Sequence, residues 1–216
     1  MNKEWSELNK SMQAQIKKKD TWPDGVDTLI SLRNQLMDTL LSFKQELARE
    51  DFDAMPYINA DGYHSKNIAY SIWHIFRIED IVAHTLIAGD GQVFFKGEYQ
   101  KRINSPIITT GNELIKEQIS DFSKQLNIDE LYTYIQEVKK STEEIVRGLS
   151  YDVLKQKVSE DRKNILISQN VVSTDEEAYW LIDYWCGKDI RGLIQMPFSR
   201  HWIMHIEASL RIKGKL

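Results

Sequence analysis

Two of the five histidines lie four positions apart near the end of the chain, in the segment SRHWIMHIEASLRI at residues 199–212. If this segment is helical, His201 and His205 project from one face about one turn apart. That spacing allows both imidazoles to bind one metal ion, but it is also common for surface histidines and hydrogen-bonded core histidines. Spacing alone therefore leaves two alternatives, a metal clamp and a pair of packing residues.

His74 is the candidate for a third ligand. It lies in the middle of NIAYSIWHIFRIED (67–80), the most apolar segment of the chain, where an imidazole without a partner would cost free energy. Three neutral imidazoles leave at least one position open on a four- or five-coordinate ion, which is typical of catalytic sites. An ion held in this way lowers the pKa of a bound thiol or water and presents it as a nucleophile. We therefore predict a metal site formed by His74, His201 and His205.

The donor type also indicates the metal. Imidazole nitrogens favour divalent transition metals over magnesium and calcium, which prefer oxygen ligands. We expect zinc or nickel, with copper, iron and manganese as alternatives. The other two histidines fit the site less well. His64 precedes the apolar helix and could at most contact one of the metal ligands without binding the ion itself. His84 is about 80° away from the helix face of His74. We expect His84 to face a neighbouring segment or solvent.

Other kinds of chemistry have weaker support. The carboxylates at 79–80 and 143–144 could suggest a carboxylate-bridged di-iron bundle, but the chain contains no Glu-x-x-His. It also lacks a Gly-x-Ser-x-Gly motif, a phosphate-binding glycine loop and a dinucleotide fingerprint. Cys186 is the only cysteine, and we interpret it as a small buried or half-buried residue. Trp180, Trp185 and Trp202 are expected in the core or in a pocket wall.

These residues must be positioned by helices. Apolar spacing and turn residues predict helices at about 4–18, 26–49, 65–88, 127–148, 173–185 and 197–212, with a polar helix possible at 112–125. The pairs Asn127 with Glu130 and Ser173 with Glu176 have the spacing of capping boxes. Pro197 suits the first turn of the last helix.

Strand-like patterns are limited to residues 165–167 and 171–172, so the chain is expected to be all-α. Four main helices joined by loops of unequal length predict a four-helix bundle with a short N-terminal helix. We expect residues 1–216 to form a single domain, with an N-terminal extension at 1–22 and long loop insertions at 90–112 and 150–172.

Composition limits the partners. The 28 lysines and arginines are balanced by 32 aspartates and glutamates, and both signs alternate along the chain, so neither nucleic acid nor a membrane surface is expected to bind. The first 20 residues lack the apolar stretch of a signal peptide, and the longest nearly apolar run, 68–76, is about half the ~20 residues of a membrane span. One cysteine permits no internal disulfide. We expect a soluble cytoplasmic protein acting on a small molecule.

A family resemblance joins these features. The apolar helix from Asn67 to His74, followed by Glu79, together with the His-x-x-x-His of 201–205, resembles the DinB-like family of metal-binding four-helix bundles over about residues 26–212. In that family the middle helix supplies one histidine and the last helix two. The resemblance thus implies the same three ligands here. The chain departs from the family after the second clamp histidine, where residues 206–208 read Ile-Glu-Ala instead of a glycine followed by Gln or Glu.

The resemblance also implies a range of functions. Some relatives transfer a low-molecular-weight thiol to an electrophile or isomerise a substrate with a thiol cofactor, so we expect a metal-dependent thiol S-transferase or a hydrolase that activates water. The alternative is a non-catalytic bundle whose histidines bind metal for stability or sensing, or pack in the core. Members of the family often pair, and Phe94-Phe95 could form an apolar patch. We therefore expect a homodimer.

Overall fold

The chain is all-helical, as predicted. The computed structural model describes residues 2–216, and no strand occurs within that range. The α-helices are α1 (Lys3–Gln15), α2 (Trp22–Glu46), α3 (Ile68–Asp80), α4 (Val93–Lys96), α5 (Tyr99–Ile103), α6 (Glu117–Gln125), α7 (Ile128–Gly148), α8 (Glu160–Ser168), α9 (Glu176–Cys186), α10 (Ile190–Gln195) and α11 (His201–Lys213). The π-helical turns are Ile81–Ala88 and Met196–Arg200, and the 3-10 turns are Lys19–Thr21, Arg49–Phe52, Gly62–Ser65 and Tyr151–Lys155.

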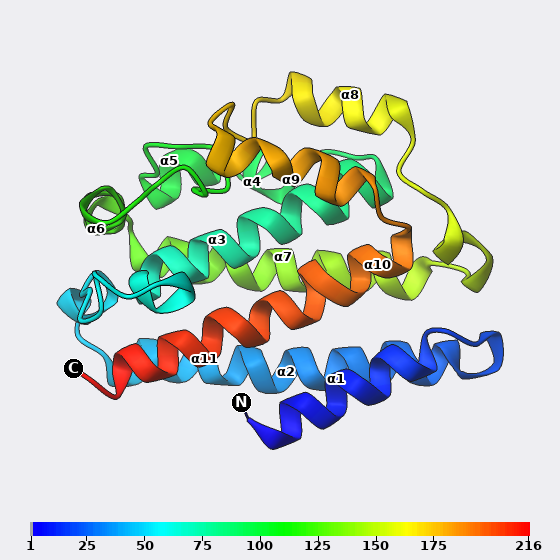
Figure 1. Cartoon of the computed structure of the whole chain (residues 1–216), viewed down its shortest axis with the longest axis horizontal. Coiled ribbons are helices and arrows are strands. Elements are labelled where there is room, and N and C mark those ends of the chain that lie inside the picture. Colours follow the sequence, from blue (N-terminus) through cyan, green and yellow to red (C-terminus); the bar gives the residue numbers. More distant parts are fainter. Residues whose placement is uncertain (1) are drawn as a thin grey trace.

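Helices α2, α3, α7 and α11 form a closed set of contacts. In Figure 1, α11 lies between α2 and α3, α7 runs alongside α3, and α1 packs beside α2. Each of α2, α3, α7 and α11 contacts two of the other three. This arrangement places α3 and α11, the two helices that carry the predicted ligands, side by side. None of the helices in the described part of the chain is long and apolar enough to cross a membrane.

Helix α3 is the most buried element, as its sequence predicts, and all 13 of its residues are buried. Its start is set by Asn67, whose side-chain oxygen accepts hydrogen bonds from the backbone N–H of Tyr70 (2.8 Å) and the hydroxyl of Ser123 (2.9 Å). The capping residue is therefore Asn67, two residues after Ser65, which the sequence predicts as the residue that opens this helix. The helical path continues through the π-helical turn and ends at Gly89, whose φ of 76° is the left-handed conformation typical of a helix C-terminus.

Two other predicted helix starts are wrong. Helix α2 begins at Trp22, because Pro23 lies within its first turn, where a missing N–H costs no hydrogen bond. Pro197 does not open the last helix: the helical path begins at Ile190, and Pro197 lies inside the π-helical turn before α11. A π-helical turn breaks the regular hydrogen-bond pattern, which lets the chain accept a proline without ending the helix.

The two predicted capping pairs have different outcomes. The side chain of Asn127 accepts from the backbone N–H of Glu130 at 3.2 Å, so the start of α7 is confirmed. At α9 the capping residue is Asp175, which accepts from the backbone N–H of Glu177 at 2.9 Å, instead of Ser173. Both carboxylates and amides satisfy free N–H groups at a helix start, and Asp175 is the residue adjacent to the first turn.

The two predicted loops contain short helices. Residues 90–112 include α4 and α5, and residues 150–172 include α8, so the strand-like pattern at 165–167 is helical. Phe94 packs in the core against Trp73 and Tyr134, with ring centroids 5.5 and 5.8 Å away, whereas Phe95 is 43% exposed. The expected apolar surface patch is therefore limited to one of the two phenylalanines.

Candidate metal centre

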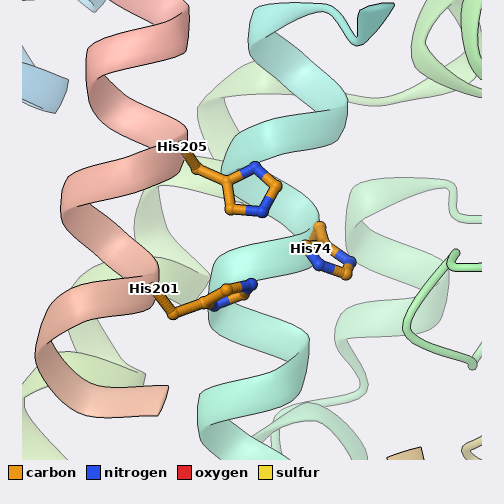
Figure 2. Close-up of side chains that lie close together, drawn as sticks. All are labelled: His74, His201 and His205. Atoms are coloured by element: carbon orange, nitrogen blue, oxygen red, sulfur yellow. The ribbon is translucent and has the colours of Figure 1, made fainter. Parts of the chain in front are cut away.

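The structure brings the three predicted ligands together. His74 extends from α3, and His201 and His205 extend from adjacent turns of α11, so that the three rings converge (Figure 2). The ring centroids are 5.0 Å apart for His74 and His201, 4.8 Å for His74 and His205, and 4.6 Å for His201 and His205. One ring nitrogen from each histidine lies within 4.8 Å of the other two.

A hydrogen bond sets the tautomer of His74. Its Nδ1 is 2.8 Å from the carbonyl oxygen of Thr110, and because a carbonyl only accepts, Nδ1 must carry the proton. This leaves the lone pair of Nε2 available for an ion. Donation of the other ring N–H to a backbone carbonyl is the usual way in which proteins orient a metal-binding histidine.

The loop that carries Thr110 is held against α3. The hydroxyl of Tyr70 donates to the carbonyl of Gly111 at 2.9 Å, and the ring of Tyr70 stacks on His74 with a centroid distance of 5.4 Å. Gly111 has a φ of 77°, and a Cβ atom added to it would lie 3.0 Å from a ring carbon of Tyr70. Glycine is therefore needed at this close approach, directly after the Thr110 carbonyl that contacts His74.

The three imidazoles are neutral and mostly without partners. Burial lowers the pKa of His74 to about 4 and lowers the pKa values of His201 and His205 well below the usual value, and the neighbouring histidines lower the last two further. Nδ1 of His201 and both ring nitrogens of His205 are buried without a hydrogen-bond partner. Since buried polar atoms nearly always have a partner, a shared ion would explain one unpartnered nitrogen of each of these two residues.

The size of the cluster fits a transition metal. Ligand nitrogens of a tetrahedral zinc site, about 2.0–2.1 Å from the ion, are about 3.3 Å from one another. The three nitrogens here lie within 4.8 Å, so small ring rotations would close the remaining gap. The donor set, three imidazoles without a carboxylate, favours zinc, nickel or another transition metal over magnesium or calcium.

Two cavities open on the cluster. The first, called here the aromatic cavity, has a volume of about 220 Å³ and reaches all three histidines. Its walls are mostly apolar and include Ile78, Trp180, Leu181, Tyr184, Trp185, Met196 and Pro197. The second, called here the polar cavity, has a volume of about 270 Å³ and reaches His74 and His205. Its walls include Gly62, Ser65, Lys66 and Tyr70, and Tyr63 and Asn112 line both cavities.

The prediction for the tryptophans is confirmed in detail. Trp180 and Trp185 line the aromatic cavity, although Trp180 is 51% exposed. Trp202 is buried and its indole N–H donates to the Glu79 carboxylate at 2.7 Å. The tryptophans thus divide between the wall of the cavity and the support of α11.

Glu79, the acidic residue that follows His74 in the motif, contacts an arginine from another helix. Its two carboxylate oxygens accept from Arg33 at 2.7 and 2.9 Å, and both side chains are fully buried. Arg33 also donates to the carbonyl of Phe198 at 3.0 Å, within the π-helical turn that precedes His201. This network joins α2, α3 and the start of α11, and the sequence offered no local signal for Arg33.

Loss of the Glu79 charge should destabilise the fold. We expect Glu79→Gln to lower the free energy of unfolding by about 3 kcal/mol, because it leaves the guanidinium of Arg33 buried with too little compensating charge. The matched control is Glu144→Gln on the exposed surface of α7, which should change it by less than about 0.5 kcal/mol. Urea unfolding measures both. Equal effects of the two substitutions would show that the buried pair does not stabilise the fold.

The remaining histidines lie outside the cluster. His84 is buried, with Nδ1 2.6 Å from Asp90 and Nε2 3.0 Å from the hydroxyl of Ser141, so it faces neighbours and is not exposed to solvent. None of these three residues lines the two cavities at the cluster. His64 is hydrogen-bonded to Arg211 on α11 and does not touch the three clustered rings.

Cys186 fits its predicted minor role. It is half-buried at the end of α9, and burial raises the pKa of its thiol. A raised pKa reduces the thiolate fraction at neutral pH, which argues against a nucleophilic cysteine.

Comparison with known proteins adds no identification. No family model matches the chain, and no curated protein matches it. The DinB-like resemblance therefore stays a prediction, and the geometry of the cluster is the basis for assigning a function.

Proposed function

We propose that the protein is a metal-dependent enzyme that joins a low-molecular-weight thiol to a small electrophile. His74, His201 and His205 would bind one zinc or nickel ion. The observation that carries the proposal is that three buried, neutral imidazoles converge where two cavities open. The same observation supports water activation as a related reaction of the same site.

The number of protein ligands favours catalysis over a structural metal. Within residues 2–216, the only cluster of histidine, cysteine or acidic side chains with metal-binding geometry contains these three histidines and no fourth ligand. Structural zinc sites usually have four protein ligands, whereas catalytic sites keep one position for water or substrate. The two cavities would give a substrate access to that position.

The proposed reaction is a nucleophilic substitution. His74, His201 and His205 would hold the divalent ion, and that ion would supply the acidity that makes a thiol nucleophilic near neutral pH. The sulfur forms a bond to the electrophilic carbon, the bond from that carbon to the leaving group breaks with its electron pair, and the thiol proton passes to solvent. The carbonyl of Thr110 orients His74. The rings of Tyr184 and Trp185 would bind the apolar part of the electrophile and exclude water.

Fold and assembly belong to the same proposal. The closed set of contacts among α2, α3, α7 and α11 supports a four-helix bundle of the DinB-like kind. We further propose a homodimer, in which exposed Phe95 lies at the interface. Sedimentation that shows only a 25.3 kDa species at micromolar concentration would contradict the dimer.

The reaction can be tested with a simple thiol and monobromobimane, which becomes fluorescent when sulfur displaces bromide. Protein purified without chelator should contain about one transition-metal ion per chain and accelerate the reaction. Chelation should remove the acceleration, and zinc or nickel should restore it. Hydrolysis of 4-nitrophenyl acetate in place of thiol transfer would favour water activation. A bound ion without either activity would favour the alternative, a non-catalytic metal-binding bundle.

A further inference from the structure

Lys66 is a cation without a carboxylate partner at the edge of the candidate metal centre. It is half-buried just before α3, and its Nζ lies 5.4 Å from the centroid of the Tyr70 ring. Among residues 2–216, no ion pair or hydrogen bond of the Lys66 side chain is found. Glu113, which carries a negative charge toward Tyr70, accepts from the hydroxyl of Thr109 and does not pair with Lys66.

The same cavity joins Lys66 to two of the ligands. Lys66, His74 and His205 all line the polar cavity. The Lys66 ammonium therefore borders the same space as two of the imidazoles that would hold the ion. With three neutral imidazoles as ligands, nothing in the ligand set offsets the charge of a divalent ion, and Lys66 adds to it. No acidic side chain lines this cavity, so a ligand with a negative charge would complement it.

The aromatic cavity has the opposite character. No lysine, arginine, aspartate or glutamate lines it, and apart from Asn112 its walls are rings and apolar side chains. An anionic group placed there would be desolvated without a partner, which is unfavourable. The two cavities thus divide the surroundings of the cluster into an apolar side and a cationic side.

We propose that Lys66 binds the carboxylate of the thiol substrate while the sulfur of that thiol occupies the open coordination position. The inference rests on the proposed function and makes it more specific: the thiol is a small mercaptocarboxylate held in the polar cavity, and the electrophile enters from the aromatic cavity. Lys66 supplies a charge-assisted hydrogen bond, which is stronger than a bond between neutral groups. It selects the thiol by its charge and takes no part in bond formation.

The test compares two thiols of nearly equal shape, 3-mercaptopropionate and 3-mercaptopropionamide. The protein is loaded with Co²⁺, and binding is followed by the charge-transfer absorption that appears when a thiolate sulfur binds cobalt. The wild type should bind the carboxylate about tenfold more tightly than the amide. Lys66→Met should reduce this ratio to about one, whereas Lys66→Arg should keep most of it. Lys10→Met, on the exposed surface of α1, is the matched control and should leave the ratio unchanged.

The outcomes separate the two proposals. If both thiols give the absorption band with equal affinity, and Lys66→Met binds them as the wild type does, the role of Lys66 is wrong while the thiol site stands. If cobalt binds and neither thiol gives a band, or cobalt does not bind at all, the proposed function fails and the role of Lys66 fails with it. Circular dichroism of Lys66→Met and Lys66→Arg verifies that both variants are folded.

Discussion

Alanine substitution of His74, His201 or His205 should weaken metal binding several-hundred-fold in each case. Complete four-ligand zinc sites bind with about 10–16 kcal/mol, which is about 2.5–4 kcal/mol per ligand. Removing any one of the three imidazoles leaves two protein ligands, so the three variants should lose affinity to a similar degree. Competition of the protein with a chromophoric chelator measures the affinity directly.

Thermal unfolding provides a second measurement of the same effect. An ion that binds only the folded chain stabilises it by about 2.7 kcal/mol when its concentration is 100 times the dissociation constant. The wild type should therefore melt at a higher temperature with added zinc or nickel, and the three variants should show little of this gain. His64→Ala is the matched control, because His64 contacts Arg211 and not the three clustered rings.

The packing alternative predicts a different pattern. If the three histidines only fill space, each alanine variant should be destabilised according to its own burial, with or without chelator. Added metal would then shift the melting temperature of neither the wild type nor the variants. A chelator that leaves the wild-type melting curve unchanged, together with metal-free purified protein, would show that the histidines are packing residues.

The three clustered histidines could be predicted from the sequence, because the relative position of two of them follows from helix periodicity. His201 and His205 are four residues apart in one helix, and helix periodicity alone places them on one face. His74 could be inferred because its segment is too apolar to be anywhere but in the core. The sequence did not require α3 and α11 to be neighbours; the DinB-like resemblance supplied that relation.

The residues that support the cluster could not be predicted in the same way. Thr110 reaches His74 through its backbone carbonyl, so its side chain carries no signal, and Gly111 next to it reads only as a turn residue. Arg33 lies 46 positions from Glu79 and resembles any other charged residue of an amphipathic helix. The role proposed for Lys66 follows from the cavity that it shares with His74 and His205. Contacts between distant segments have no periodicity that a single sequence could reveal.

The predicted helix boundaries failed where two residues could serve the same role. Asn67 and Asp175 cap the starts of α3 and α9, whereas the sequence pattern favours a serine two residues earlier in both cases. The usual position of a proline in a first turn predicts the same for Pro197, but here a π-helical turn accommodates it inside a longer helical path. Tertiary packing decided among locally acceptable alternatives.

The metal-free protein should lose stability as the pH falls from about 6.5 to about 4. In the unfolded chain a histidine has a pKa near 6.5. In the folded chain, burial lowers the pKa of His74 to about 4 and those of His201 and His205 well below 6.5. Between these values the unfolded state binds more protons than the folded state, so stability falls as the pH decreases. Well above pH 6.5, from about pH 7.5, all three are neutral in both states, and this contribution disappears.

The size of the effect follows from the number of protons. Well below pH 6.5, each histidine that stays neutral in the fold contributes about 1.4 kcal/mol per pH unit, and three contribute about 4 kcal/mol per pH unit. Urea unfolding of chelator-treated protein at pH 6.5, 5.5 and 4.5 measures the slope. Carboxylates also contribute to the slope of the unfolding free energy against pH, but they do so equally in the wild type and the variant. Replacing His205 by leucine should therefore reduce the slope by about 1.4 kcal/mol per pH unit, and an unchanged slope would mean that His205 is charged or solvated in the folded protein.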